Sequence, residues 1–262
     1  MPDPDLPELS RRWLRQYRPA PEAAVTLVAF PHAGGSASYF QPLSGVLGPG
    51  VEVLCLQYPG RQDRRREPCL DTVEAFVDAI GAVLRPRTER PMVFFGHSMG
   101  AVLGYETARR LEAEGDVDLL GLIVSGRRSP TTTRHETVHL RDDAGILAEV
   151  RRLNGTDAAL LDDEDIRQMI LPCLRADYTA VETYVHRDGP ALRCPISVLT
   201  GDADPQVTRQ EAERWSEVTS GGFRLQAFPG GHFFLNSQHG PVTRALTEAL
   251  ADFRAAAAPP RG

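Results

Sequence analysis

The sequence predicts an α/β protein with a mostly parallel central sheet and helices on both faces. Short apolar runs rich in β-branched residues alternate with helix-like segments along most of the chain. The alternation stops between about residues 130 and 190, where the chain is charged, has helical spacing and lacks any strand pattern. We therefore expect one domain over residues 1–262, with a helical lid subdomain inserted at about 130–190 between two strands.

Each expected element has its own signal in the sequence. Six segments have the composition of buried strands: residues 25–30, 51–58, 92–95, 119–126, 196–201 and 223–228. Three segments have the spacing or composition of helices: residues 72–84, 100–114 and about 241–256. Within the insertion, the apolar positions that indicate helices are Ile146, Leu147, Val150, Ile166, Met169 and Ile170.

The composition excludes several classes of protein. All 29 basic residues are arginine, and the sequence contains no lysine. This excludes a lysine Schiff base, a pyridoxal phosphate enzyme and a Walker A phosphate loop, because each of these needs a lysine. The formal charge of −6 and the pI near 5.7 argue against a nucleic-acid partner. No apolar run approaches the ~18 residues that span a membrane.

The cysteines and the start of the chain bear on metals and compartment. The four cysteines have no C-x-x-C spacing, so we expect neither disulfides nor a zinc site. The first residues are acidic and proline-rich, which is unlike a signal peptide. We therefore expect a cytoplasmic protein with no metal and no cofactor, and we take a monomer as the default state.

Residues 92–106, MVFFGHSMGAVLGYE, place one serine between glycines where a strand turns into a helix. The segment GHSMG at 96–100 fits G-x-S-x-G, the nucleophile elbow, in which small residues two positions before and after the serine let the backbone pass close to itself. The pattern is short, and a chance match is the alternative. Because it follows an apolar strand and precedes a helix, as the motif requires, we interpret Ser98 as a nucleophile.

A serine nucleophile needs a base, and the base needs an acid that orients it. In sheets with this elbow, the acid and then the histidine follow the serine along the chain. Beyond the fifth strand only His232 and His239 remain; His232 lies in the glycine-rich FPGGHFFLN loop after the last strand, whereas His239 begins the terminal helix. The LTGDADPQV segment follows the fifth strand, and its Gly-x-x-Asp turn favours Asp204 over Asp202, which can brace the turn. The sequence thus predicts a triad of Ser98, His232 and Asp204.

Acyl transfer by a serine also needs two backbone donors for the tetrahedral oxyanion. One is the amide of Met99, the residue after the nucleophile, and the other comes from the loop after an early strand. The FPHAGGSASYF segment at 30–40 fits this loop, with Ala33 as the donor, although a plain turn before a helix has a similar pattern. Removing one such donor typically costs ~2.7–4 kcal/mol in the reaction barrier.

With these residues identified, the chain resembles the type II thioesterases that accompany polyketide synthases and nonribosomal peptide synthetases. The resemblance extends over nearly the whole sequence and includes FPHAGGSASYF, LQYPGRQDRRREP, FFGHSMGA, SGRRSP, LRADYTAVETY, TGDADPQV and FPGGHFFL. It implies the α/β-hydrolase fold, the same triad and oxyanion hole, and a mobile helical lid at about 130–190. The lid segment LNGTD at 153–157 departs from the Leu-Gly-Gly-Thr-Pro that is frequent in the family.

The resemblance also implies the substrate and the partner. The substrate would be an acyl thioester on the phosphopantetheine arm of an acyl carrier or peptidyl carrier protein, and the role would be editing. In many chain-terminating thioesterase domains the acid follows the fourth strand, but residues 125–128 read SGRR, with no carboxylate. Together with the short tails at both ends, this favours a free-standing hydrolase.

Two arginine clusters are candidates for contact with the carrier or its phosphate. Carrier proteins are usually acidic, and this chain is acidic too, so any attraction must be local. One candidate cluster contains Arg61 and Arg64, with Arg65 and Arg66 beside them, and the other contains Arg127 and Arg128. Solvated surface or internal ion pairs are the alternative for both clusters.

Two other functions fit parts of the pattern. A medium-chain fatty acyl-carrier thioesterase or a carboxylesterase uses the same scaffold and the same triad. A non-catalytic α/β-hydrolase receptor that binds a small ligand is the alternative from another class. Such receptors often lose part of the triad, whereas all three members are present in this sequence.

Overall fold

A computed structural model describes residues 8–257, except for residues 88, 116 and 155–160. In the described part, seven strands form one sheet in the order β1-β3-β2-β4-β5-β6-β7. β1 is antiparallel to β3, and the other neighbouring pairs are parallel. The strands are β1 (Leu14–Arg15), β2 (Val25–Phe30), β3 (Val51–Leu56), β4 (Met92–His97), β5 (Leu119–Ser125), β6 (Ile196–Gly201) and β7 (Phe223–Phe228).

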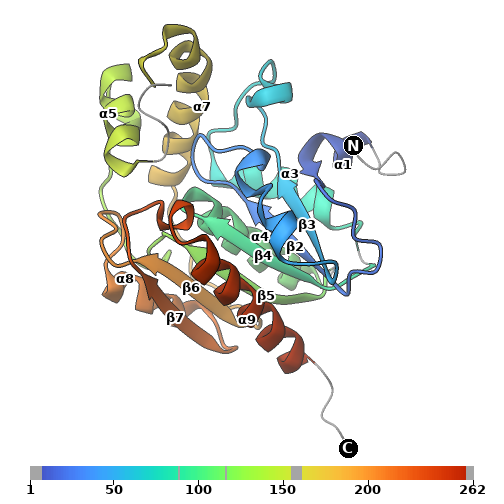
Figure 1. Ribbon diagram of the computed structural model, residues 1–262. Helices are drawn as coiled ribbons and strands as arrows, with labels where there is room; N and C mark the ends of the chain where they lie inside the picture. The colour runs from blue at the N-terminus through green and yellow to red at the C-terminus, as the bar shows by residue number, and fades with distance from the viewer. Residues whose placement is uncertain (1–7, 88, 116, 155–160, 258–262) are drawn as a thin grey trace, which may run out of the picture.

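Helices cover both faces of this sheet, as the sequence predicts (Figure 1). The α-helices are α1 (Glu8–Trp13), α2 (Leu43–Val46), α3 (Val73–Leu84), α4 (Met99–Glu114), α5 (Asp143–Leu153), α7 (Glu164–Glu182), α8 (Arg209–Glu213) and α9 (His239–Ala257). Short 3-10 helices are η1 (Ala37–Phe40), η2 (Gln62–Arg64), η3 (Val138–Leu140), η4 (Arg214–Val218) and η5 (Phe234–Asn236). Among the described helices, none is both long and apolar enough to cross a membrane.

Alternate residues along each strand pack into two separate cores. In β4, Met92 and Phe94 belong to the core on the side of α3 and α4, whereas Val93 and Phe95 belong to the core on the side of α9. This is the period-2 alternation of a strand buried on both faces. The sheet is therefore held from both sides, and its strand ends are fixed in position.

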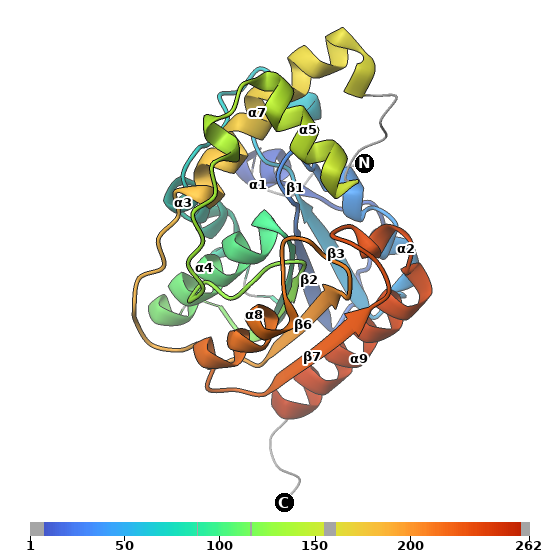
Figure 2. The same cartoon turned by 90° about the vertical axis from the view of Figure 1, so that its left-hand side faces the viewer.

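The predicted insertion forms a separate layer over one edge of the sheet. It contains η3, α5 and α7, which lie above the sheet in Figure 2. These elements have a small hydrophobic core of their own, to which Ile146, Leu161 and Leu174 belong. The departure noted at residues 153–157 falls mostly outside the described residues; α5 ends at Leu153, and Asn154 caps it in a left-handed conformation.

The six predicted strands are all present, with bounds that differ by at most two residues. The expected strand at 51–58 ends at Leu56, because Pro59 and Gly60 begin a turn there. Neither α1 nor β1 is among the elements predicted from the sequence. β1 is only two residues long and is recognisable through its pairing with Leu56 and Cys55 of β3.

Candidate active site

Ser98 lies on a sharp turn between β4 and α4. Its backbone dihedrals are φ 54° and ψ −116°, a conformation that side chains rarely adopt and that costs of order 1–3 kcal/mol. The turn is held because the Ser98 amide donates to the Ser125 carbonyl at 2.8 Å. The serine therefore lies at the carboxyl end of the central strand with its Oγ presented to the cavity described below.

The glycines two residues before and two residues after the serine are required by close backbone contacts. A Cβ on Gly96 would overlap the carbonyl of Gly100, and a Cβ on Gly100 would overlap the carbonyl of Phe30. Any larger side chain would push the strand and the helix apart. The elbow expected from G-x-S-x-G thus has a direct steric cause in this chain.

Hydrogen bonds join the loop after β6, which carries Asp204, to the loop after β7, which carries His232. The Asp202 amide donates to the Phe228 carbonyl at 2.9 Å, and the Ala203 amide donates to the Gly230 carbonyl at 2.9 Å. In return, the Gly230 amide donates to Asp202 Oδ1 at 3.0 Å. Asp202 therefore braces the loops, and Asp204 is left to face His232.

The predicted triad is assembled in hydrogen-bond contact. His232 Nδ1 lies 2.9 Å from Asp204 Oδ2 and 3.1 Å from Asp204 Oδ1. On the other side of the ring, His232 Nε2 lies 3.0 Å from Ser98 Oγ. The side chains of His232 and Asp204 are almost fully buried, with 3% and 0% of their surface exposed, respectively. A proton on Nδ1 shared with the carboxylate leaves Nε2 free to accept the serine proton.

The predicted oxyanion donors flank the serine. Met99 is the first residue of α4, and the first amides of a helix have no partner within the helix. In the loop after β2, the Gly35 amide donates to the His32 carbonyl at 2.9 Å and the Gly34 amide donates to Asp177 Oδ2 at 2.7 Å. Ala33 and Met99 both line the cavity beside Ser98. Their amides are therefore available as a pair of donors.

A cluster of rings packs around His232. The ring centroid of His97 lies 5.2 Å from that of His232 and 5.1 Å from that of Phe233, and His32 stacks edge-on against Phe233 at 4.8 Å. Burial, together with the nearby charges of His232 and Arg61, lowers the pKa of His32 to about 3. Burial also lowers the pKa of His97 well below its ordinary value. Both rings are therefore neutral at physiological pH, and His232 is the ring that contacts both Asp204 and Ser98.

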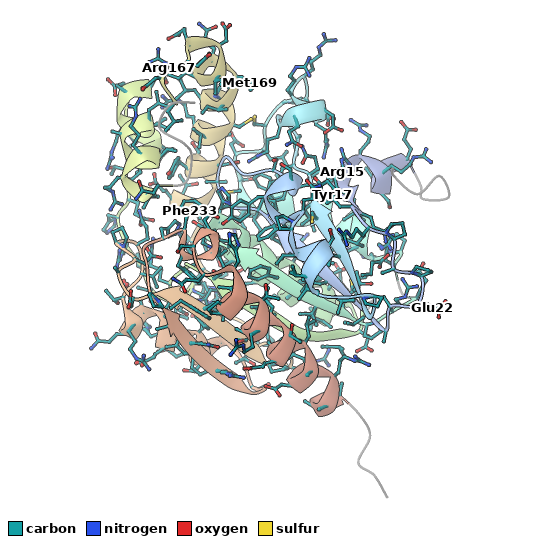
Figure 3. The ribbon with its side chains drawn as sticks, in the orientation of Figure 1. Arg15, Tyr17, Glu22, Arg167, Met169 and Phe233 are labelled. Carbon is teal, nitrogen blue, oxygen red and sulfur yellow. The ribbon has the colours of Figure 1, made fainter. Side chains whose placement is uncertain are left out.

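A cavity of about 250 Å³ separates the triad from the insertion. Ser98 and His232 line its lower side, with Phe233, labelled in Figure 3, next to them. The insertion contributes a mainly apolar wall, formed by Val138, Val150, Leu153, Ile166, Ile170, Leu174, Tyr178 and Val181. Polar groups on the wall are Arg127, Glu136, Glu182 and Gln206.

The arginines proposed to contact the carrier lie in another environment than expected. Arg61, Arg64 and Arg128 are buried, with 4%, 6% and 5% of their side-chain surface exposed. Their ion-pair partners are Asp177, Glu67 and Glu136, respectively. This correction has a plain physical reason, since a buried guanidinium needs a carboxylate close by. These three residues fit the internal ion-pair alternative and cannot form a docking surface.

Arg127 differs from these three because it faces the cavity. Its side chain is 11% exposed and lies 3.9 Å from Glu136, at the limit of an ion pair. Burial, helped by the charge of Arg128, lowers the pKa of Arg127 to about 10, so the guanidinium remains protonated at neutral pH. Sequence reasoning missed Asp177, whose role depends on a contact with Gly34, 143 positions away in the chain.

Metal-ligand groupings are not found among the described residues: no three His, Cys, Asp or Glu side chains there could hold an ion together. The four cysteines are free thiols. The hydrogen bonds from Asp204 through His232 to Ser98 form an arrangement that can perform nucleophilic acyl transfer, with Ser98 as the candidate nucleophile and two amides as candidate oxyanion donors.

The chain is similar to known thioesterases. The thioesterase domain family model matches residues 25–253. A probable cadicidin biosynthesis thioesterase of Streptomyces griseus is 54% identical over 96% of this chain and 69% of its own length. Thioesterase PikA5 of Streptomyces venezuelae is 48% identical over 95% of this chain and 89% of its own length.

A solved structure extends the likeness to the fold. The type II thioesterase BorB from the borrelidin biosynthetic cluster superposes with a TM-score of 0.85 at 48% identity, and the match covers 91% of this chain and 97% of BorB. The mostly parallel sheet with helices on both faces is the α/β-hydrolase fold of these enzymes. The chain belongs to the thioesterase family and is a type II thioesterase of the polyketide and nonribosomal peptide group.

Proposed function

We propose that this thioesterase removes short acyl groups from the phosphopantetheine arms of acyl carrier or peptidyl carrier proteins, as an editing enzyme. The observation that carries the proposal is the chain of hydrogen bonds from Asp204 through His232 to Ser98, which ends at the cavity beneath the insertion. The chemistry uses only side chains and backbone amides. The relatives are named for biosynthetic thioesterases, which fits this role.

The first half-reaction acylates the serine. Ser98 Oγ attacks the thioester carbonyl carbon while His232 Nε2, 3.0 Å away, takes the hydroxyl proton. Asp204 holds the ring in the required tautomer and stabilises the imidazolium that forms. The amides of Ala33 and Met99 donate to the oxyanion, and the phosphopantetheine thiolate leaves as the carbonyl re-forms. The thiolate then takes the proton from His232 and becomes the free thiol, so His232 is again neutral.

The second half-reaction releases the acyl group. A water molecule attacks the acyl-serine while His232 removes one of its protons, and the same two amides hold the second oxyanion. His232 then returns a proton to Ser98 Oγ, and a free acid leaves. Since an alkyl thiol has a pKa near ~8.5, its thiolate departs with little help from a general acid. The triad therefore suits a thioester, and the cavity must supply acyl selectivity.

The size of the cavity supports a short acyl group. Its volume of about 250 Å³ lies below the ~300–1,000 Å³ of pockets that hold drug-sized ligands. Apolar side chains from α5 and α7, such as Val150 and Leu174, close the space opposite Ser98. A short acyl residue left on a carrier by mispriming or premature decarboxylation is a substrate of suitable size, and its removal would free the blocked carrier.

Mass spectrometry of intact carrier proteins tests the editing role. Carriers loaded with acetyl, propionyl, hexanoyl and decanoyl groups are incubated with the enzyme, and the rate of loss of each acyl group is measured. We expect fastest release of the two- and three-carbon groups, and a loss of about 10⁴-fold or more in the Ser98→Ala variant. Undiminished hydrolysis by Ser98→Ala would exclude the triad. A rate maximum at decanoyl would instead favour a medium-chain thioesterase.

Partitioning with a second nucleophile tests the acyl-enzyme. Methanol is added to reactions that use the same acyl group on two different thiols, pantetheine and N-acetylcysteamine. If both reactions pass through one acyl-Ser98, the ratio of methyl ester to free acid is the same for both leaving groups. Different ratios would show that water attacks the thioester directly.

Arg65 and Arg66 remain as candidates for local attraction to an acidic carrier, because both are exposed on the loop after β3. We propose that replacing both with alanine raises KM for acyl carriers about three- to tenfold and leaves hydrolysis of acyl-N-acetylcysteamine unchanged. Arg244→Ala, an exposed position on α9, serves as the control. An equal loss on both substrates would contradict docking at this loop.

The remaining features of the proposal concern state and compartment. Every group that the mechanism uses comes from one chain, so we propose that the enzyme acts as a monomer. The four cysteines of the described residues are free thiols, which is the state that a reducing cytoplasm favours. Size-exclusion chromatography with light scattering measures the oligomeric state directly.

A further inference from the structure

A buried ion pair joins the lid helix α7 to two loops of the sheet edge. Asp177 on α7 is fully buried and pairs with Arg61, whose side chain is 4% exposed. Burial raises the pKa of the Asp177 carboxyl, and the neighbouring Arg61 opposes this rise. Burial also opposes the charge of Arg61, but Asp177 outweighs it and raises the pKa of Arg61, so the guanidinium is charged. The triad does not use either residue.

Both partners of this ion pair are fixed to backbone groups as well. Asp177 Oδ2 accepts the amide proton of Gly34 at 2.7 Å, and the same oxygen accepts from Arg61. Arg61 also donates to the Pro59 carbonyl at 2.9 Å. The carboxylate thus connects α7 with the loop after β2, which carries the oxyanion donor Ala33, and with the loop after β3.

The hydrogen bond to Gly34 fixes the direction of the neighbouring peptide groups. Three successive amides, those of residues 33–35, lie in this loop. The Gly35 amide closes a turn onto His32, and the Gly34 amide is held by Asp177. With these two amides engaged, the Ala33 amide is the one left for an oxyanion. A change in the Gly34 peptide plane would also turn the carbonyl of Ala33 and the peptide before it.

Only the second half of α7 is seated on the sheet edge. Cys173 Sγ donates to the Gly60 carbonyl at 2.8 Å, and the Leu174 side chain packs so closely on Gly34 that a Cβ there would collide with it. Pro172 lies inside the helix just before these contacts and has no amide proton for the helical hydrogen bond at that position. The first half projects away from the sheet, with Arg167 and Met169 at its outer end (Figure 3).

Stability alone is a poor explanation for this ion pair. Replacing a buried ion pair with apolar residues of similar volume is often neutral or stabilising. In addition, Asp177 Oδ1 and Arg61 Nε have no hydrogen-bond partner among the described residues, so the pair is incompletely satisfied there. A geometric role at Gly34 accounts for the carboxylate better than a contribution to folding does.

We propose that Asp177 is a positioning residue, which sets the oxyanion donor of Ala33 by holding the Gly34 amide from the lid helix. This inference rests on the proposed function, since it requires catalysis by Ser98. It follows that the oxyanion hole is complete only while the second half of α7 is seated. Opening of the lid for substrate entry is therefore restricted to α5 and to the part of α7 before Pro172.

Two double variants separate the hydrogen bond from the charge. Asp177→Asn with Arg61→Met removes both charges and keeps an acceptor for the Gly34 amide. Asp177→Leu with Arg61→Met removes both charges and the acceptor, at nearly the same side-chain volume. Thermal melting establishes that each variant is folded. Steady-state hydrolysis of acetyl-pantetheine then gives kcat and KM, and inhibition by a trifluoromethyl ketone analogue of the substrate gives affinity for a tetrahedral adduct.

We expect kcat of the leucine variant to fall about tenfold or more below that of the asparagine variant, because an oxyanion donor is worth about 10²–10³ in rate and is here misplaced rather than removed. KM should agree within about twofold, and affinity for the ketone should fall in step with kcat. Equal kcat in the two variants would overturn the inference. A general loosening of the pocket would also overturn it, and would weaken substrate and ketone binding alike.

Folding failure and failure of the proposed function give other results. If either double variant does not fold, the ion pair serves stability and the positioning role is wrong. If Ser98→Ala in the wild-type background retains hydrolysis, the proposed function fails, whatever the double variants do. If Ser98→Ala is inactive and the two double variants are equally active, the proposed function stands and only the role of Asp177 is rejected.

Discussion

The two sides of the acyl cavity are built in different ways. The floor consists of the carboxyl ends of β2, β4, β6 and β7 and the loops that follow them, with Ser98, Asp204 and His232. The roof consists of α5 and α7. In the floor, backbone hydrogen bonds and glycine contacts fix each functional side chain, such as the bond between the Ser98 amide and the Ser125 carbonyl. In the roof, a small separate core and charged side chains hold the helices.

The two sides meet at specific side-chain contacts. From α5, Glu149 accepts a hydrogen bond from Gln206, two residues after the triad acid, at 2.9 Å. From α7, Asp177 holds the Gly34 amide. The floor can therefore be recognised from short local motifs, while the roof acts through long-range contacts that leave no motif. Reaction chemistry should depend on the floor, and acyl selectivity on the roof.

The largest expected effect is a loss of stability, caused by a substitution at the closest backbone contact in the floor. Gly100→Ala would force a Cβ against the Phe30 carbonyl, which is backbone and cannot move aside. We expect a loss of about 3 kcal/mol or more in the free energy of unfolding, measured by urea denaturation. Gly104→Ala, one turn later in α4, is the matched control, because its Cβ would lie 3.5 Å from a Leu122 methyl, in ordinary contact.

The control should differ in sign as well as size. Alanine is favoured over glycine inside a helix by about 1 kcal/mol, so Gly104→Ala should leave stability equal or increased. Activity should be retained in Gly104→Ala and lost in Gly100→Ala. Tolerance of alanine at position 100 would mean that the backbone contact in the elbow is looser than described.

The next effect concerns the pH dependence of stability, which should differ between the floor and the roof. The floor contains His32, with its pKa lowered to about 3 by burial, and His97, with its pKa lowered well below its ordinary value by burial. For a lowered folded pKa, stability is full above the unfolded value of about 6.5 and is lost as pH falls toward the folded value. The roof's Glu149 has its pKa lowered by a hydrogen bond from Arg152, so its contribution is lost only below about 4.5.

Stability should therefore fall between pH 6.5 and 5 because of the floor alone. Each buried histidine adds at most about 1.4 kcal/mol of unfolding free energy lost per pH unit. Urea denaturation of the wild type and of His32→Gln at pH 7, 6 and 5 measures this slope. The variant should have the shallower slope. Parallel slopes would show that His32 takes up a proton in the folded state.

This difference between floor and roof explains what the sequence could predict. The six central strands and the nucleophile elbow come from periodicity and from glycine sterics, both of which are local properties. The residues of the predicted triad also come together, because parallel strands bring their carboxyl ends to one edge. The position of the insertion was recognisable because this part of the chain lacks the apolar runs that are typical of strands.

The arginines show where local reasoning ends. A basic run such as 61–66 indicates a charged surface, yet Arg61 and Arg64 are buried, and the Arg64 guanidinium lies over the ring of Trp13. Arg61 pairs with a residue 116 positions away, and no spacing rule connects the two. The same holds for β1, which is defined by its partner strand rather than by its own two residues. Such pairings can be identified only once the three-dimensional arrangement is known.

The smallest expected effect tests whether the roof sets acyl selectivity. Ile170 lies on α7 before Pro172 and lines the cavity, whereas its neighbour Met169 is 53% exposed and points away from the sheet (Figure 3). Ile170→Ala removes three carbons from the wall and makes room for a longer chain. We expect kcat/KM for hexanoyl relative to acetyl pantetheine to rise about tenfold, since one methylene in an apolar pocket is worth about 10–200-fold.

Met169→Ala is the control for this last change, because it alters the same half of the helix without reaching the cavity. Its hexanoyl-to-acetyl ratio should equal that of the wild type. Because Ile170 does not contact the triad, the rate with acetyl pantetheine should fall only a few-fold in Ile170→Ala. A loss of rate with both chain lengths and an unchanged ratio would mean that the first half of α7 supports the floor. In that case the separation of chemistry and selectivity between floor and roof would not hold.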